Sequence, residues 1–159
     1  MKIIYMHHAE RDIGDNHNNP ELRQLEDITS MGIQEAELLS KRLEKQNITA
    51  IVTSPYLRCV HTAEIINKYH NVPIIEDERF NEMYHDEEWK NLLKRNMEAI
   101  DSIVNTYNDD DTIICITSGV NFSAFVCYFY NIEPNDNVPW SQAADISPII
   151  FTKGKKMLD

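Results

Sequence analysis

The chain has 159 residues, 42% of them hydrophobic, and this size fits one domain, residues 1–159, with a sizeable core. It carries 26 acidic against 15 basic residues, a formal net charge of −11, which argues against nucleic acid as a partner. The longest apolar-rich run, residues 122–130, is too short to span a bilayer. We therefore expect a soluble, cytoplasmic protein with no membrane partner and with three reduced, buried cysteines.

The first part of the chain predicts a strand, a loop, a helix and a second strand. Residues 2–6 form an apolar run, whereas residues 12–26 are rich in Asn and Asp and show no sustained period, which is typical of a loop. Apolar residues then recur at helical spacing over residues 29–45, and Thr29 has the character of an N-cap. Residues 48–53 are predicted as the next strand.

The middle of the chain predicts two helices around a short strand. Residues 56–69 are predicted as a helix, followed by a strand at residues 72–75 and a long amphipathic helix at residues 87–107. Most of the inward stripe of the first of these helices is expected from Leu57, Val60, Ala63, Ile65 and Ile66.

The last part of the chain predicts a strand, a helix and a final strand. Residues 112–117 are continuously apolar, which indicates a strand buried on both faces, and residues 119–130 and 146–152 complete the alternation. Strands separated by helices predict an α/β fold of three layers, α/β/α, around a mainly parallel sheet.

Reactive side chains follow three of the predicted strands. His7 and His8 come at the end of the first strand, Arg58 lies shortly after the second, and Ser118 follows the strand at residues 112–117. Because the carboxyl ends of parallel strands lie at one edge of a sheet, these groups and a helix N-terminus are expected to converge there. Such a set suits an anion, above all phosphate.

Five blocks of sequence carry this chemistry, at residues 7–10, 27–36, 54–63, 79–83 and 114–119. In this order they resemble the hallmark blocks of the histidine phosphatases, the phosphoglycerate mutase-like superfamily. The block His7-His8-Ala9-Glu10 aligns with that family's Arg-His-Gly followed by Glu or Gln, and residues 54–63 align with its Ser-Pro-x-x-Arg-x-x-Gln-Thr-Ala. Residues 114–119 align with Val-x-Val-Ser-His-Gly. The resemblance covers most of the chain and implies a phosphoglycerate mutase-like fold.

The resemblance implies hydrolysis of a small phosphomonoester in two steps through a phosphohistidine. His8 would be the nucleophile, and Glu82 would donate a proton to the leaving oxygen and then activate water. Arg58 would clamp the phosphoryl oxygens, with His7 and Ser118 as further substrate-binding residues. No cofactor is implied. A metal site at the adjacent histidines is disfavoured, since neighbouring strand residues face opposite ways.

Two departures from the family pattern affect the expected activity. The family's arginine before the nucleophile is His7 here, and its second histidine is Ser118. Loss of one preorganised donor typically costs ~2.7 to 4 kcal/mol of transition-state stabilisation, so weakened or altered turnover is expected. Four side chains are candidates to compensate, although each also fits a surface position: Arg11, His17, His61 and His85.

Three readings of the function follow from these residues. The first is an active histidine phosphatase, and the second is a catalytically degenerate protein of the same fold that binds a phosphate ligand or has a regulatory role. The third, a cysteine phosphatase using Cys115, fails because residue 121 is Asn and not the arginine that such a loop needs.

The sequence does not name the substrate. A small phosphorylated substrate or inorganic phosphate is the expected partner, and hydrolysis is favoured over mutase activity. Substrate selection is expected from residues 12–26, 84–90 and 131–144, with Trp140 as a residue that can stack on a ligand. No feature of the sequence specifies an oligomeric state.

Overall fold

The computed structural model describes residues 1–14, 18–133 and 149–152. A single sheet of five strands runs through it in the order β3-β2-β4-β1-β5. The strands are β1 (Lys2–His7), β2 (Ala50–Thr53), β3 (Ile74–Glu76), β4 (Thr112–Thr117) and β5 (Ile149–Thr152). The first four are parallel, and β5 pairs antiparallel with β1. The predicted mainly parallel sheet is confirmed.

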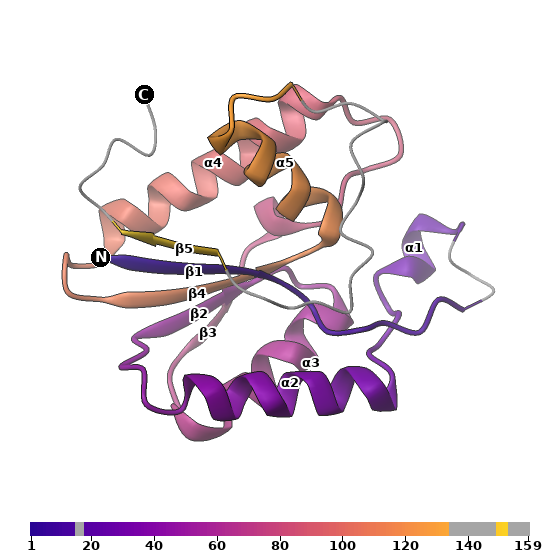
Figure 1. Ribbon diagram of the computed structural model, residues 1–159. Helices are drawn as coiled ribbons and strands as arrows, with labels where there is room; N and C mark the ends of the chain where they lie inside the picture. Colours follow the sequence, from indigo (N-terminus) through magenta and orange to yellow (C-terminus); the bar gives the residue numbers. More distant parts are fainter. Residues whose placement is uncertain (15–17, 134–148, 153–159) are drawn as a thin grey trace.

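Helices cover both faces of this sheet, as Figure 1 shows. On one face lie α2 (Ser30–Leu43) and α3 (Leu57–Ile66), and on the other lie α4 (Trp89–Thr106) and α5 (Gly119–Phe129). Two short 3-10 helices, at Asn67–Tyr69 and Glu78–Phe80, complete the connections. The three-layer α/β/α architecture is therefore confirmed.

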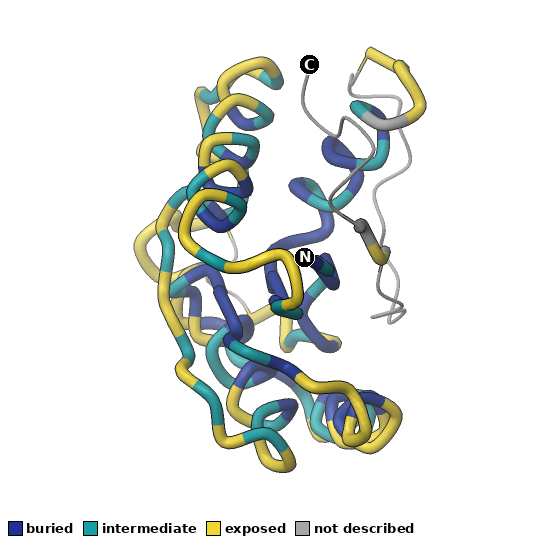
Figure 2. The backbone as a smooth tube through the Cα atoms, turned by 90° about the vertical axis from the view of Figure 1, so that its left-hand side faces the viewer, coloured by how far each residue is buried: buried dark blue, intermediate teal, exposed yellow. Residues whose placement is uncertain are grey.

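The core consists of two apolar clusters, one on each side of the sheet. Ile4 and Met6 of β1 pack in the cluster beneath α2 and α3, whereas Ile3 and Tyr5 pack in the cluster beneath α4 and α5. This alternation follows from the pleat of a strand, which points successive side chains to opposite faces. Figure 2 shows the result, with buried segments inside and exposed helix faces outside. All residues of β4 after Thr112 are buried, as expected.

The predicted loop at residues 12–26 contains a short helix, α1 (Pro20–Arg23), so the prediction is wrong at these four residues. Asn19 caps the helix by accepting a hydrogen bond from the backbone N–H of Glu21 at 3.0 Å, and Pro20 occupies the first helical position. One turn is too short to show a helical period. The pair Asn19-Pro20 is the local sequence signal from which the start of α1 could have been predicted.

The predicted inward face of helix α3 is confirmed in part, since Ala63 and Ile66 are buried in the core and Ile65 packs against it. Leu57 is 41% exposed, and the buried residues are Arg58, Cys59, Thr62, Ala63 and Ile66. A helix face chosen by hydrophobicity alone omits Arg58, because charged residues are seldom fully buried without partners. Here the guanidinium has polar partners, described below, and they allow its burial.

The start of α2 is fixed to the segment after β1. Thr29 is the N-cap, as predicted, and its hydroxyl oxygen accepts a hydrogen bond from the N–H of Gly32 at 3.0 Å. The same hydroxyl donates to Glu10 Oε1 at 2.9 Å. A Cβ atom at Gly32 would lie well inside van der Waals contact with the carbonyl oxygen of Glu10. This glycine therefore permits the close approach of the two segments.

Three further predictions concern cysteines, membranes and the last strand. The three cysteines are free and buried, as expected. Within the described ranges, no helix combines the length and apolar character needed to cross a membrane. The last strand is observed at Ile149–Thr152, and residues 146–148 of its predicted range lie outside the described residues.

Candidate active site

His8 is held at the carboxyl end of β1 by the neighbouring strand. In the parallel register of β1 and β4, His7 pairs with Thr117, and the N–H of His8 donates to the Thr117 carbonyl at 3.0 Å. The N–H of Ala9 donates to Thr62 Oγ1 on α3 at 3.1 Å. The backbone of His8 and that of Ala9 are therefore both held by hydrogen bonds. They fix the position from which the His8 side chain, only 3% exposed, extends into the site.

The hydrogen bonds of His8 define its tautomer. Arg58 Nε lies 3.2 Å from His8 Nε2, and a guanidinium can only donate, so Nε2 is the accepting nitrogen. The proton therefore resides on Nδ1, which donates to the Ala9 carbonyl at 2.7 Å. Burial lowers the pKa of His8 well below its ordinary value, helped by His7 and Arg58 nearby. A neutral imidazole with an unprotonated Nε2 is the form required of a nucleophile.

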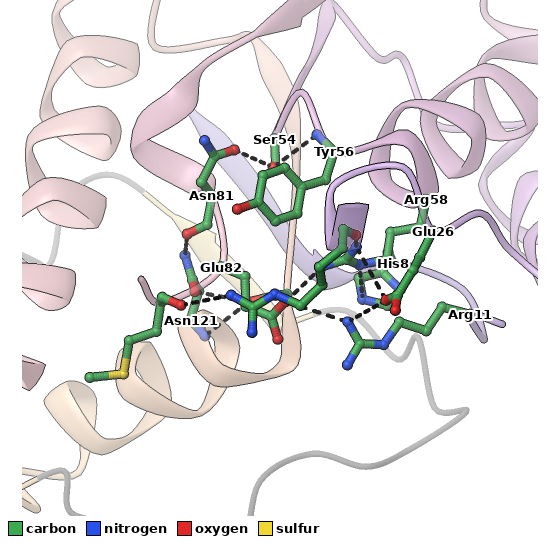
Figure 3. A network of polar contacts seen from close by, with 12 residues as sticks. His8, Arg11, Glu26, Ser54, Tyr56, Arg58, Asn81, Glu82 and Asn121 are labelled. Carbon is green, nitrogen blue, oxygen red and sulfur yellow. Dashed lines mark hydrogen bonds and ion pairs between the residues drawn. The ribbon is translucent and has the colours of Figure 1, made fainter. Parts of the chain in front are cut away.

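Arg58 joins His8 to Glu82. Its side chain is fully buried, and Nη2 donates to Glu82 Oε2 at 2.7 Å while Nη1 donates to the Arg23 carbonyl at 2.8 Å. The structure thus brings together the predicted His8, Arg58 and Glu82, as Figure 3 shows, although they lie far apart in the sequence.

Two further arginines lie against the same carboxylate oxygen. Arg11 Nη1 is 3.4 Å from Glu82 Oε2 and 3.3 Å from Glu26 Oε2, and Arg23 Nε is 3.7 Å from Glu82 Oε2. We call Arg11, Arg23, Glu26, Arg58 and Glu82 the ionic network. Three positive and two negative side chains give it a net charge of +1, within a chain whose formal charge is −11.

Local backbone contacts position Arg11 and Arg23 beside Glu82. Arg11 forms an isolated β-bridge with Ile28, which pins the segment after β1 to the start of α2. Arg23 ends α1, and the carbonyl of the next residue, Gln24, accepts a hydrogen bond from the N–H of Leu57 at 3.0 Å. The sequence had offered Arg11 as a compensating residue, whereas Arg23 and Glu26 were not predicted.

The segment that carries Glu82 is held from its other side by uncharged groups. Asn121 Nδ2 donates to the carbonyl of Asn81 at 2.8 Å and is 3.3 Å from Asn96 Oδ1, and Ser54 Oγ donates to Asn81 Oδ1 at 2.7 Å. Ser118 Oγ donates to Asn121 Oδ1 at 2.9 Å. We call Ser54, Asn81, Asn96, Ser118 and Asn121 the amide network.

Arg95 also holds this segment. It donates to the backbone carbonyls of Arg79, Asn81 and Glu82 at 2.8, 2.7 and 3.2 Å, and it pairs with Glu87 at 2.7 Å. It was not predicted as a site residue, because its contacts go to the backbone of a segment that only the tertiary fold places beside α4. Arg95 is a positioning residue for Glu82.

His7 and Ser118 lie at the same sheet edge, in different surroundings from the ionic network. The rings of His7 and His8 are 4.0 Å apart between centroids. Burial lowers the pKa of His7 to about 4, so this imidazole is neutral near pH 7. His7 Nδ1 is buried without a hydrogen-bond partner among the described residues. Ser118 is the N-cap of α5, and its hydroxyl is engaged with Asn121.

The remaining candidates lie elsewhere. His61 Nδ1 contacts Asp27 at 2.8 Å, and the exposed His85 pairs with Asp86 at 3.0 Å. His17 and Trp140 lie outside the described residues, as does most of the predicted selectivity segment at residues 131–144. Complete burial raises the pKa of Cys115, so its thiol stays protonated, which agrees with the rejection of a cysteine nucleophile.

The structure resembles those of several solved proteins over most of its length. YhfR of Bacillus stearothermophilus is 24% identical, with a TM-score of 0.78 and coverage of 94% of this chain and 89% of that chain. A phosphoglycerate mutase of Bacillus anthracis str. Sterne is 12% identical, with a TM-score of 0.78 and coverage of 96% and 88%. The protein histidine phosphatase SixA, solved with tungstate, is 17% identical, with a TM-score of 0.59 and coverage of 87% and 81%.

These likenesses establish a phosphoglycerate mutase-like fold. No curated protein matches the chain. The sequence profile of the histidine phosphatase superfamily (branch 1) matches residues 8–92, which is more than half of the chain and spans His8, Arg58 and Glu82. The chain belongs to the histidine phosphatase superfamily, branch 1.

Proposed function

We propose that this protein hydrolyses a small phosphomonoester through a phosphohistidine at His8, with activity altered by the changes at positions 7 and 118. One observation carries the proposal: the neutral imidazole of His8 presents its unprotonated Nε2 to Arg58, whose guanidinium also contacts Glu82. A nucleophile, a cationic clamp and a carboxylate within one buried cluster are what phosphoryl transfer requires.

In the first step, the Arg58 Nε–H turns from His8 Nε2 to a phosphoryl oxygen, and the freed Nε2 lone pair attacks phosphorus while the bond from phosphorus to the ester oxygen breaks. Glu82 enters as a carboxylate, takes up the proton of the monoanionic phosphomonoester and passes it to the leaving oxygen, which departs as an alcohol. The Nδ1–H bond to the Ala9 carbonyl stabilises the positive charge that develops on the ring. Arg58 binds the equatorial oxygens, whose charge it matches.

In the second step, the Glu82 carboxylate takes a proton from water while the water oxygen attacks phosphorus. The phosphorus–nitrogen bond breaks and His8 regains its lone pair, while inorganic phosphate takes the proton from Glu82 and leaves. His7 and Ser118 are proposed as substrate-binding residues. Ser118 would have to turn its hydroxyl from Asn121 to a phosphoryl oxygen. The tungstate complex of SixA supports an oxyanion as the ligand of such a site.

We further propose that the chain forms one histidine-phosphatase-like domain over residues 1–159 and that it acts in the cytoplasm. The three buried free thiols support the second proposal, because proteins of oxidising compartments usually pair their cysteines.

The test is hydrolysis of an aryl phosphate by the wild type, by His8→Ala, and by the double variant His7→Arg with Ser118→His. Activity that His8→Ala abolishes supports the proposal, and activity that this change leaves intact contradicts it. Turnover by the double variant alone would favour a catalytically degenerate phosphate-binding or regulatory protein.

A further inference from the structure

The ionic network holds more positive charge than a single clamp needs. Arg58, Arg11 and Arg23 all approach one atom, Glu82 Oε2, at 2.7, 3.4 and 3.7 Å. An anionic oxygen with three guanidinium groups within 4 Å has the surroundings of a bound phosphoryl oxygen.

The donors of this cluster are incompletely used. Arg23 Nε is buried and makes no hydrogen bond among the described residues, because Glu82 Oε2 is too distant at 3.7 Å. Arg11 Nη1 donates to Glu82 Oε2 at 3.4 Å, which is long for a charge-assisted bond, and its contact with Glu26 Oε2 at 3.3 Å is an ion pair without a hydrogen bond. A larger anion with more acceptor oxygens can satisfy both guanidinium groups where one carboxylate oxygen does not.

Positions 7 and 118 do not supply the positive charge that a phosphoryl group needs, so other residues must supply it. His7 is neutral near pH 7 and Ser118 is engaged in a helix cap, so in the free protein neither supplies the positive charge of the arginine and histidine in the family's pattern. Arg11 and Arg23 approach the cluster from the segment after β1 and from α1.

We propose that Arg11 and Arg23 bind the phosphoryl group together with Arg58, and that Glu82 occupies their donors until substrate arrives. The inference rests on the proposed function and adds two substrate-binding residues to it. On binding, phosphoryl oxygens replace Glu82 Oε2 at the three guanidinium groups. The carboxyl group is then released to face the leaving oxygen.

The experiment compares wild type with Arg11→Gln, Arg23→Gln and their double variant, and uses Arg42→Gln as the control. Arg42 is an exposed arginine of α2, so this control removes the same charge away from the site. Calorimetry with inorganic phosphate gives the affinity, and aryl phosphate hydrolysis gives kcat and KM. Each single variant is expected to bind phosphate about tenfold to a hundredfold more weakly, with a larger loss in the double variant. Arg42→Gln should change the affinity little.

Arg11→Lys and Arg23→Lys keep the charge beside Glu82, so they test the same ligands if the glutamine variants do not fold. They should bind phosphate with intermediate affinity, since lysine lacks the fork of arginine. Glu82→Gln should lose hydrolysis but bind phosphate more tightly, because the competing carboxylate is gone. Unchanged phosphate affinity in the folded double variant overturns the proposal, and so does a Glu82→Gln protein that binds phosphate no more tightly than wild type.

Failure of this inference is distinguishable from failure of the proposed function. If wild type hydrolyses aryl phosphate and the double variant keeps its KM, the two arginines are not ligands although the enzyme assignment stands. If wild type has no turnover but its phosphate binding depends on Arg11 and Arg23, the binding site stands and the enzyme assignment falls.

Discussion

The ionic network and the amide network both reach Glu82 or its segment, and they differ in how replaceable their contacts are. In the ionic network, three arginines crowd one carboxylate oxygen at distances from 2.7 to 3.7 Å, so an incoming anion can take over the same donors. In the amide network, short side chains satisfy one another and the backbone around Asn81. The difference indicates that the proposed ligand would bind at the ionic network, whose donors can change partner, while the amide network supports the segment of Glu82.

Removal of Arg58 should have the largest effect, because this buried residue is both the proposed phosphoryl clamp and the partner of two carboxylates. Arg58→Gln is expected to lower kcat/KM for aryl phosphate by about 10²- to 10³-fold. It should also lower the free energy of unfolding by about 3 kcal/mol, since Glu82 and Glu26 lose a buried partner. Steady-state kinetics and urea unfolding measure the two effects. Kinetics and stability like those of Arg42→Gln would contradict both roles.

Acid should lower the free energy of unfolding through His7 and His8, whose pKa values are lowered in the folded protein. The amide network holds no group that titrates. The pKa of His7 is about 4 when folded, below the ordinary 6.5, so the unfolded chain binds more protons between these values. Stability is then full above about pH 6.5 and falls as the pH drops towards 4, by about 3 kcal/mol at most for His7. The lowered pKa of His8 acts in the same direction.

Urea unfolding between pH 4 and pH 7 tests this dependence. His7→Gln should flatten the slope, and the control is His85→Gln, which removes a side chain that is 83% exposed. An equal slope in all three proteins would mean that His7 is not held neutral.

The amide network should affect stability more than binding. Asn121→Ala leaves the Ser118 hydroxyl without its acceptor and removes one of two donors to the Asn81 carbonyl, which Arg95 still contacts. The change should cost about 1 to 2 kcal/mol of unfolding free energy. Phosphate affinity of the folded variant, measured by calorimetry, should stay within a few-fold of wild type. A large loss of affinity with little loss of stability would reverse the distinction between the networks.

The smallest expected effect concerns the glycine that brings α2 close to the segment after β1. In Gly32→Ala the new methyl group would clash with the Glu10 carbonyl, so the segment that carries Arg11 must shift. We expect a loss of about 1 to 2 kcal/mol in unfolding free energy, together with weaker phosphate binding. The control is Leu38→Ala, on the exposed face of α2. Ser40 of the same helix is unsuitable, because its hydroxyl donates a hydrogen bond to α3. A stable Gly32→Ala protein with normal affinity would show that the loop adjusts freely.

The elements that sequence alone predicted are those with a long period or a clear cap. The strand at Thr112–Thr117 was predicted to the residue, and Thr29 was recognised as a cap. Helix α1 was missed because a single turn has no period. The inward face of α3 was predicted correctly at Ala63 and Ile66 but not at Arg58, which is buried through polar partners.

The residues of the candidate site also divide into those that the sequence predicted and those that it did not. The convergence of His8, Arg58 and Glu82 could be predicted because they lie in sequence blocks that can be aligned one by one. Arg23 and Glu26 lie in a segment without such a block, and their place depends on the hydrogen bond between Leu57 and Gln24. Contacts of that kind are set by tertiary packing, which no local pattern records.

The pairing of β1 with β4 has a consequence for how the protein folds. Lys2 is the register partner of Thr112, and His7 is the partner of Thr117, so every bond of this ladder joins the beginning of the chain to a strand made late in synthesis. Contacts between such distant segments are slow to form, because a long loop must close first. A chain still emerging from the ribosome therefore carries His8, the proposed nucleophile, after a strand that is not yet paired. The site is assembled only after β4 has been made.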